Sequence, residues 1–240
     1  MTAAALREKT SRARRASGAQ LSDVAYQRIR QMIVECDLAP GAAVSQSQLL
    51  AATQLGMAAV RTALARLQQE GLVRPLPRRG YLVSPVTPQD INELLDLRLL
   101  LEPASLRLAV GRLTAGDLAG LRRLASVGYS SSSRDSERRF LRANRDFHLT
   151  IALCGGNGRL YRMLAQVLDE FARITFLTMG AVDESENWRL GHEAILDALA
   201  RGDAAAAESS CRGELTAARG AMLSAVIASS GISRVNIARI

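Results

Sequence analysis

Arginine and histidine side chains supply most of the chemistry that this sequence suggests. Arg61 and Arg66 fall in a short helical pattern, and Arg78 and Arg79 crowd a turn further along, beside Gly80. A guanidinium can donate two hydrogen bonds to a guanine edge, or it can hold a phosphate. The spacing therefore favours binding to a nucleic acid, although runs of charge also occur on ordinary solvated surfaces.

The chain has two histidines, His148 and His192. Asn144 precedes His148 by four residues, so one face of a helix would present both side chains. Imidazole nitrogens and side-chain oxygens bind divalent cations, and they also hydrogen-bond directly to ligands. Since a histidine is more often structural than a ligand, these residues leave a metal site, a metal-free pocket and a structural role open.

The arginines lie in a segment with the order helix, turn, helix, strand, wing, strand. Helical and strand patterns predict helices over 21–36, 45–53 and 58–71, and strands over 72–73 and 81–83. Val60 and Leu64 share one face of the third helix, and Arg61 points away from it. A helix of this size fits a DNA major groove, and a basic hairpin beside it can reach phosphates. Residues 21–84 are therefore predicted to form a winged helix-turn-helix domain.

The rest of the chain shows helical patterns and no strand signal. We expect helices over 88–112, 114–127, 135–153, 158–180, 184–200 and 203–228. Thr87, Thr114 and Asn157 are expected to cap three of them, and Pro103 to kink or break the first. The fold is therefore predicted to be mainly α, with a C-terminal all-α bundle of six or seven helices over about 88–228.

Charge is distributed unevenly along the chain. Residues 1–84 hold 12 Lys or Arg against 5 Asp or Glu, whereas residues 85–240 hold 19 against 18. This asymmetry is typical of a basic DNA-binding part joined to a near-neutral part. Residues 1–20 are rich in arginine and are predicted to be a disordered basic arm. With only 4 Phe, 4 Tyr and 1 Trp, stacking platforms for single-stranded nucleic acid are not expected.

Several protein classes are disfavoured. Cys36, Cys154 and Cys211 are odd in number and far apart, which indicates reduced thiols in a cytoplasmic protein without a disulfide or metal framework. Neither a secretory signal nor an apolar run of roughly 18 residues is visible, so no membrane segment is expected. The chain also lacks an activated nucleophile pair, a P-loop and a dinucleotide fingerprint, so it is not expected to be an enzyme.

Over residues 21 to about 225 the chain resembles GntR-type transcriptional regulators of the FadR-like branch, which carry an FCD ligand-binding domain. The segments that carry the resemblance are CDLAPGAAV, VRTALARLQQEGLVRPLPRRGYLV, LRLLLEPASLRLA, FLRANRDFHLTIALCGGNGRL and GHEAILDALARGDAAAA. Each is weak alone, but their order and spacing are specific. The resemblance implies a homodimer that binds a double-stranded DNA operator. It also implies that a small-molecule effector, expected to be a carboxylate, controls operator affinity from the helical domain.

The resemblance places DNA contacts on the recognition helix and the wing. The expected set is Ser47, Met57, Arg61, Thr62, Arg66, Arg78, Arg79 and Gly80. Family members often have Ser-Arg-Thr-Pro before the Val-Arg of the recognition helix, where this chain has Gly56-Met57-Ala58-Ala59. Because the Arg and Thr that commonly touch DNA are absent, the operator sequence does not carry over.

The resemblance also implies a metal site in the helical domain. Its ligands would be Asn144, His148, His192 and Glu214. The family usually has Asp in place of Asn144 and a third His in place of Glu214, so metal affinity should be lower here. Zinc is the first choice of cation, with nickel or manganese as alternatives.

An effector would bind beside or instead of the metal. The expected effector-binding residues are Arg98, Asn144, His148 and His192, although Arg98 could instead pair with Glu102 one turn on. Two other classes remain open: a metal-dependent hydrolase or metal-binding bundle with an accessory DNA-binding domain, and a DNA-compacting protein. The basic winged segment favours a regulator over a hydrolase, and a measured preference for one operator would separate a regulator from a compacting protein.

Overall fold

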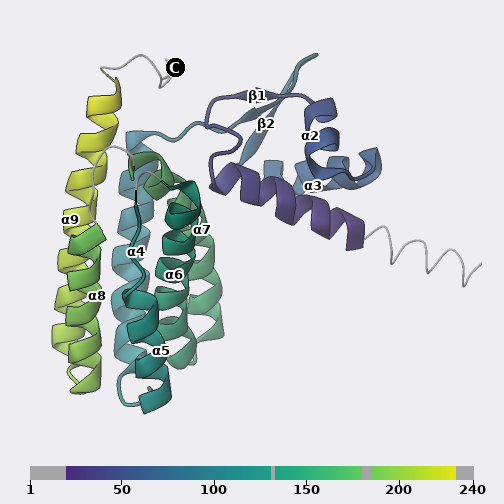
Figure 1. Ribbon diagram of the computed structural model, residues 1–240. Helices are drawn as coiled ribbons and strands as arrows, with labels where there is room; N and C mark the ends of the chain where they lie inside the picture. Colours follow the sequence, from purple (N-terminus) through teal and green to yellow (C-terminus); the bar gives the residue numbers. More distant parts are fainter. Residues whose placement is uncertain (1–19, 131–132, 180–184, 231–240) are drawn as a thin grey trace, which may run out of the picture. The chain divides into compact units, whose positions relative to one another are not determined.

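The computed structural model describes residues 20–130, 133–179 and 185–230 (Figure 1). The predicted arm over residues 1–20 lies, except for Gln20, outside these ranges. The chain divides into two compact units, and the boundary between them in the sequence falls between Pro85 and Val86. Within the described residues, no helix is long and apolar enough to cross a membrane.

The first unit combines helices with a small antiparallel sheet. A helix over residues 20–34 precedes β1 (Ala43–Val44), α2 (Gln46–Thr53), α3 (Met57–Gln69), β2 (Val73–Leu76) and β3 (Gly80–Val83). The three strands have the order β1-β3-β2. The predicted winged helix-turn-helix is therefore confirmed. The strand β1 was not predicted, and β2 is longer than expected, so Arg74 lies within a strand rather than in the connection.

The core of this unit fixes the orientation of α3. Val60, Leu64 and Leu67 are fully buried, and they belong to one cluster with Ile29 and Ile33 of the helix over residues 20–34. This apolar face, which includes the buried Ala63, holds α3 against the unit, so Arg61, Thr62 and Ala65 face outward. The second helix begins at a capping box, in which the Ser45 side chain accepts from the backbone N–H of Gln48 at 3.2 Å.

The described part of the second unit is helical. It contains α4 (Pro88–Ala109), α5 (Ala115–Ala125), α6 (Arg134–Cys154), α7 (Gly158–Thr178), α8 (Ser185–Ala200) and α9 (Ala204–Ser230). Thr87 and Thr114 cap α4 and α5 as predicted, and they form capping boxes with Asp90 and Asp117. Asn157 caps α7 through two backbone N–H groups. The prediction of an all-α bundle is confirmed.

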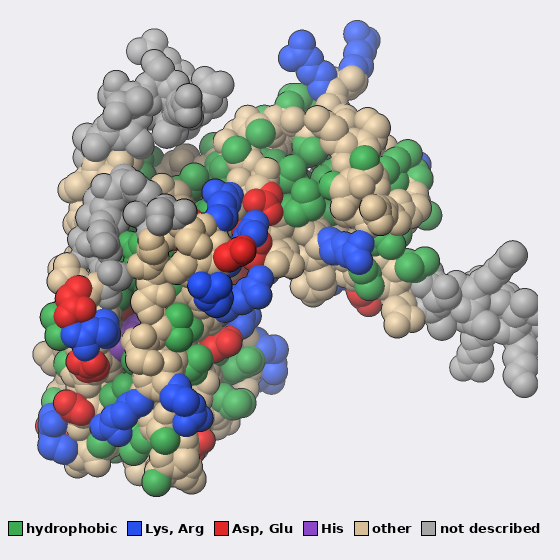
Figure 2. All heavy atoms as spheres, in the orientation of Figure 1, with side chains coloured by type: hydrophobic (Ala, Val, Ile, Leu, Met, Phe, Trp, Pro, Cys, Tyr) green, Lys and Arg blue, Asp and Glu red, His purple; other side chains and the backbone are tan. Residues whose placement is uncertain are grey.

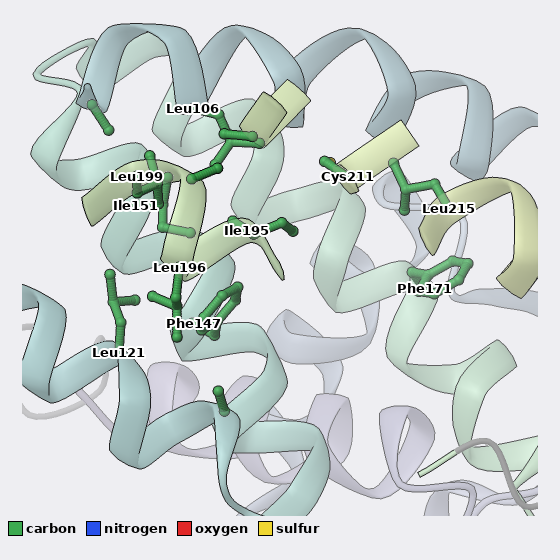
Figure 3. Close-up of a cluster of buried hydrophobic side chains, with 14 of the residues drawn as sticks. Leu106, Leu121, Phe147, Ile151, Phe171, Ile195, Leu196, Leu199, Cys211 and Leu215 are labelled. Carbon is green, nitrogen blue, oxygen red and sulfur yellow. The ribbon is translucent and has the colours of Figure 1, made fainter. Parts of the chain in front are cut away.

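The six helices enclose one large apolar core. Helix α4 packs against α6, α7 and α9, while α8 lies against α5 and α9 (Figure 1). Figure 3 shows how Phe147 of α6, Phe171 of α7 and Leu215 of α9 line this interior together with Ile195 and Leu196 of α8. These apolar side chains surround a group of buried polar residues, described below.

Of the kink or break expected at Pro103, the break is wrong, because α4 continues through this residue to Ala109. Proline lacks a backbone N–H, so the carbonyl of Leu99 loses its usual helical partner. Arg212 of α9 donates from Nη1 to this carbonyl at 3.5 Å. Pro103 is also buried in the bundle. Tertiary packing therefore carries the helix across a residue that would end it in isolation.

Candidate functional sites

The outward face of α3 presents a set of accessible side chains. Arg61 and Thr62 are exposed, and Met57, the first residue of α3, is 45% exposed. Ser47, in the first turn of α2, is exposed as well. Because Val60 and Leu64 point inward, Arg61 extends away from the core and is free to reach a groove of DNA.

Arg66 differs from Arg61, since the first unit already uses its guanidinium. Its Nη1 lies 2.6 Å from Oδ1 of Asp23, and its guanidinium carbon lies 3.9 Å from the centre of the Tyr26 ring. An ion pair and a cation–π contact therefore hold Arg66 against the helix over residues 20–34. Arg66 therefore has partners within the first unit, and its expected contact with DNA stays a prediction.

The wing is a basic, exposed feature among the described residues of the first unit. Arg74, Arg78 and Arg79 are all exposed, and Figure 2 shows Lys and Arg side chains projecting from the free end of the β2–β3 hairpin. Arg78 adopts a positive φ of 63°, which turns the chain sharply at the tip. Charges at the end of a projecting hairpin can reach phosphates.

Gly80 has a role other than the one expected. Its φ is 100°, and a Cβ added to it would lie 2.4 Å from the carbonyl oxygen of Val44. The close backbone approach that Gly80 permits is thus to β1 of the same sheet. The structure assigns Gly80 to holding the wing against β1, and no contact of Gly80 with DNA is needed to explain the glycine.

Replacing Arg78 and Arg79 together by alanine should weaken binding to all DNA sequences by a similar factor. Each lost phosphate contact should also flatten the salt dependence of binding by about one unit of slope. Fluorescence anisotropy at several salt concentrations, with operator and scrambled duplexes, measures both quantities. A variant that loses discrimination between duplexes while keeping its salt slope would assign base reading to the wing.

A buried polar centre lies inside the second unit. His148 of α6, His192 of α8 and Glu214 of α9 each offer a ligand atom, and these atoms lie within 4.8 Å of one another. The two imidazole rings are 5.2 Å apart at an angle of 74°. Both histidines are almost fully buried, and Figure 2 shows histidine colour only as a small recessed area of the second unit. The structure therefore brings together three of the four predicted metal ligands.

Glu102 of α4 fixes the orientation of His148. Oε2 of Glu102 lies 3.0 Å from Nδ1 of His148, and Oε1 accepts from Nε of Arg98 at 2.5 Å. Because an ionised carboxylate only accepts, Nδ1 of His148 carries a proton, and the lone pair is on Nε2. This Nε2 lies 3.4 Å from Nη2 of Arg98. The alternative prediction of an Arg98–Glu102 ion pair thus describes the structure.

The charges of this centre stabilise its carboxylates. Burial disfavours ionisation of Glu102, but the charge of Arg98 and the hydrogen bond from His148 outweigh it and hold the pKa of Glu102 far below its usual range. Burial likewise opposes ionisation of Glu214, yet nearby His192, His148 and Arg98 lower its pKa. Burial raises the pKa of the neighbouring Cys211 thiol, so this thiol is not a metal-binding or nucleophilic thiolate.

Two atoms of the centre lack hydrogen-bond partners among the described residues. Nε2 of His192 and Oε2 of Glu214 are both buried and unpaired, although Nε2 of His192 lies 3.5 Å from Oε1 of Glu214. The His192 ring is fixed by stacking on Phe147 at 4.0 Å. Since buried polar atoms are nearly always paired, such atoms indicate that a ligand, an ion or water completes the site.

Two cavities reach this centre from different sides. The first, called the Trp188 cavity, is lined by Arg98, Asn144, Phe171, Thr175, Trp188, Glu214, Leu215, Ala218 and Met222. The second, called the Arg189 cavity, is lined by Leu124, Ala125, Val127, Gly128, Phe140, Asn144, Glu186, Arg189 and His192. Asn144 borders both, whereas His148 lines a third cavity with Glu102 and Cys211. The four predicted effector-binding residues therefore surround the centre without sharing one cavity.

An aromatic group stands beside these cavities. The rings of Phe140 and Trp188 stack at 5.1 Å with an angle of 13°, and Tyr129 lies 5.1 Å from Phe140. Phe140 lines the Arg189 cavity and Trp188 lines the Trp188 cavity. Apolar ring surface is thus available to a ligand whose polar end reaches the centre.

Sequence reasoning missed part of the site. Glu102 was considered only as a partner of Arg98, yet it also holds His148. Gly191 was not considered, although Glu214 packs directly against it. The i, i+4 spacing of Arg98 and Glu102 was a usable signal for their pair. No comparable signal existed for Gly191, because its contact with Glu214 joins two different helices.

The two units match two known protein families. Residues 21–83 match the bacterial regulatory proteins of the gntR family, and residues 93–217 match the FCD domain. An HTH-type transcriptional regulator of Streptomyces ambofaciens is 30% identical over 192 residues, which cover 80% of each chain.

Solved structures share the same fold. E. coli McbR/YncC superposes with a TM-score of 0.73 at 21% identity, covering 85% of this chain and 97% of that one. A putative transcriptional regulator GntR from Rhodococcus sp. RHA1 gives 0.67 at 25% identity, covering 86% and 98%. A winged helix-turn-helix followed by an all-α unit is the architecture of these regulators. This chain belongs to the GntR family of bacterial transcriptional regulators and carries an FCD domain.

Proposed function

We propose that the protein is a sequence-specific regulator whose affinity for a double-stranded DNA operator is set by a small molecule in the helical unit. Arg61 of α3 would contact the operator in the major groove, and Arg78 and Arg79 would bind its phosphates. The protein would act in the cytoplasm, where bacterial DNA lies. Membership of a regulator family supports this function over a hydrolase or a DNA-compacting protein.

The observation that supports an effector site is the set of unpaired polar groups around the buried centre. Arg98 uses Nε for Glu102, and its Nη2 lies 3.4 Å from Nε2 of His148, a position that a bound cation would take over; Nη1 is left for a ligand in the Trp188 cavity. Asn144 stands beside it with an amide that can donate or accept. A carboxylate effector would accept hydrogen bonds from both residues, and the Trp188 cavity, which has room for about one water molecule, would have to widen to take its apolar part against Trp188 and Met222.

A divalent cation fits the donor set, with His148, His192 and Glu214 as ligands and Asn144 as a weaker fourth. Bonds from zinc to nitrogen and oxygen are about 2.0–2.2 Å, so two ligands of one ion are at most about 4.4 Å apart. The three donors, within 4.8 Å of one another, need only a small contraction. Zinc is the first choice, ahead of nickel and manganese. The cation would supply positive charge for an effector carboxylate.

A homodimer would connect the effector to DNA binding. Leu100 of α4 is 70% exposed and Leu153 of α6 is 65% exposed, and a second copy could cover such side chains. The paired DNA-binding units would have two arrangements. Effector binding would favour one arrangement, and the operator would bind one arrangement more tightly than the other. The effector would thereby change operator affinity without touching DNA.

Replacing His148 by alanine should abolish zinc binding and weaken the effector response, while basal operator affinity stays unchanged. The reason is that His148 belongs to the helical unit, whereas the exposed residues of α3 and the wing belong to the other unit. Zinc content by mass spectrometry and anisotropy on an operator selected from random DNA measure the two effects. Mass spectrometry of the wild-type protein would also identify a co-purified ligand.

Glu193→Ala is the matched control for this experiment. Glu193 is an exposed carboxylate on α8, next to His192, and it pairs with Arg189 outside the centre. This variant should keep both zinc and the effector response. If His148→Ala retained stoichiometric zinc, the proposed cation site would be wrong; if it kept the effector response, the effector would bind elsewhere.

A further inference from the structure

Gly191, which precedes His192 on α8, leaves room for the carboxylate of Glu214. A Cβ added to Gly191 would lie 2.8 Å from Oε2 of Glu214 and 3.1 Å from its Cδ and Cγ. The backbone of Gly191 is not among those with a positive φ, so conformation does not require glycine there. Lack of space is the physical reason for glycine at position 191. Helices α8 and α9 are so close there that a methyl group would overlap the Glu214 side chain.

Glu214 is enclosed where it lies. Its side chain is 8% exposed and that of His192 is 3% exposed. Oε1 faces Nε2 of His192 at 3.5 Å, while Oε2 has no hydrogen-bond partner among the described residues. The carboxylate is therefore held beside His192 by the shape of its surroundings, and the bare backbone at Gly191 is one wall of that space.

We propose that Gly191 is a positioning residue, which lets Glu214 stand next to His192 as the carboxylate ligand of the cation. This inference rests on the proposed cation site and adds a residue that touches neither the cation nor the effector. The neutral Asn144 makes the position of Glu214 important, because Glu214 is the one carboxylate among the four donors. A displaced Glu214 would leave two imidazoles and an amide, a set with no negative charge to offset a divalent cation.

The same geometry predicts that an alanine at position 191 perturbs the site and spares the fold. The nearest overlapping atom is the end of a flexible side chain, so the carboxylate can swing away while α8 stays intact. Alanine is also a better helix former than glycine. A structural glycine would behave in the opposite way, since its replacement would lower stability.

The test is a mutant cycle in the full-length protein, with zinc binding measured by isothermal titration calorimetry after chelator treatment. Gly191→Ala should weaken zinc binding by about 10–100-fold, the usual effect of disturbing the surroundings of a ligand. Combined with Glu214→Ala, the same change should have no further effect, because the residue through which it acts is gone. Gly220→Ala is the matched control, since a Cβ at Gly220 of α9 meets nothing within 4 Å. It should bind zinc like the wild type.

Two results would overturn the inference. One is a Gly191→Ala variant that binds zinc as tightly as the wild type. The other is a Gly191→Ala change that costs the same zinc affinity in the wild-type protein and in Glu214→Ala. A wild-type protein that binds no zinc would instead remove the cation from the proposed function. A crystal structure of metal-free Gly191→Ala then decides the role of Gly191: displacement of the Glu214 carboxylate from His192 supports it, and an unmoved carboxylate refutes it.

Discussion

Replacing Glu102 by alanine should lower the free energy of unfolding of the helical unit by about 3–5 kcal/mol. Glu102 and Arg98 are 2% and 3% exposed, so the change would leave a guanidinium buried without its carboxylate. Nδ1 of His148 would lose its acceptor at the same time. Urea denaturation followed by far-ultraviolet circular dichroism measures the loss. The expected result is a much lower midpoint for the helical unit.

Glu208→Ala is the control for this experiment. Glu208 of α9 pairs with Arg107 of α4, and their side chains are 17% and 64% exposed, so the same two kinds of groups pair at the surface instead of in the interior. Such pairs contribute roughly 0–1 kcal/mol. If Glu102→Ala cost no more than Glu208→Ala, the buried pair would not be a source of stability. Replacing Arg98 and Glu102 together by leucine should recover much of the loss, because no unpaired charge remains.

Low pH should reduce the contribution of Glu102 to stability. The pKa of Glu102 is far lower in the folded protein than in the unfolded chain, so its contribution to stability is fully present above the ordinary glutamate pKa of about 4.3. As the pH falls below that value, the unfolded chain takes up the proton first, and the stability is lost progressively. Glu102→Ala should show a weaker dependence of unfolding on pH in this acidic range.

Arg61→Ala should weaken operator binding by about 1–3 kcal/mol, which is roughly 5- to 150-fold. Arg61 is the exposed cation of α3 that no described residue engages, whereas Asp23 and Tyr26 hold Arg66. The protein should remain folded, because the buried face of α3 is unchanged. Anisotropy titrations with the selected operator and with scrambled DNA measure both affinity and discrimination.

Gln69→Ala provides the comparison, because Gln69 is exposed at the C-terminal end of the same helix. It should bind the operator like the wild type. A folded Arg61→Ala variant with unchanged operator affinity would exclude this face of α3 from recognition. An equal loss on all duplexes would assign Arg61 to a phosphate instead of a base.

The sequence predicted the elements that depend on local signals. Periodic apolar residues identified the helices, and capping residues such as Thr87 and Thr114 marked where two of them begin. The errors arose where distant residues decide the outcome. Pro103 stays helical because Arg212 of α9 satisfies the Leu99 carbonyl, and β1 exists because β3 pairs with it.

The same difference between local signals and contacts of distant residues applies to the candidate sites. The convergence of His148, His192 and Glu214 came from the resemblance to a family, because ligands on three helices leave no pattern along one chain. The link from Glu102 to His148 and the space at Gly191 depend on distances between helices, which residue spacing does not contain. The pairing of Arg66 with Asp23 could not be predicted for a similar reason, since Asp23 lies on another helix.

The stacked indole of Trp188 gives the protein an optical probe of its own. It is the single tryptophan of the chain, so emission from indole arises at one place only. That place borders the cavity that also contains Asn144 and Glu214. A molecule entering there would change the polarity around the ring or its stacking on Phe140, and the emission spectrum would shift. Candidate effectors can therefore be screened on the unlabelled protein, with a signal that originates at the cavity wall.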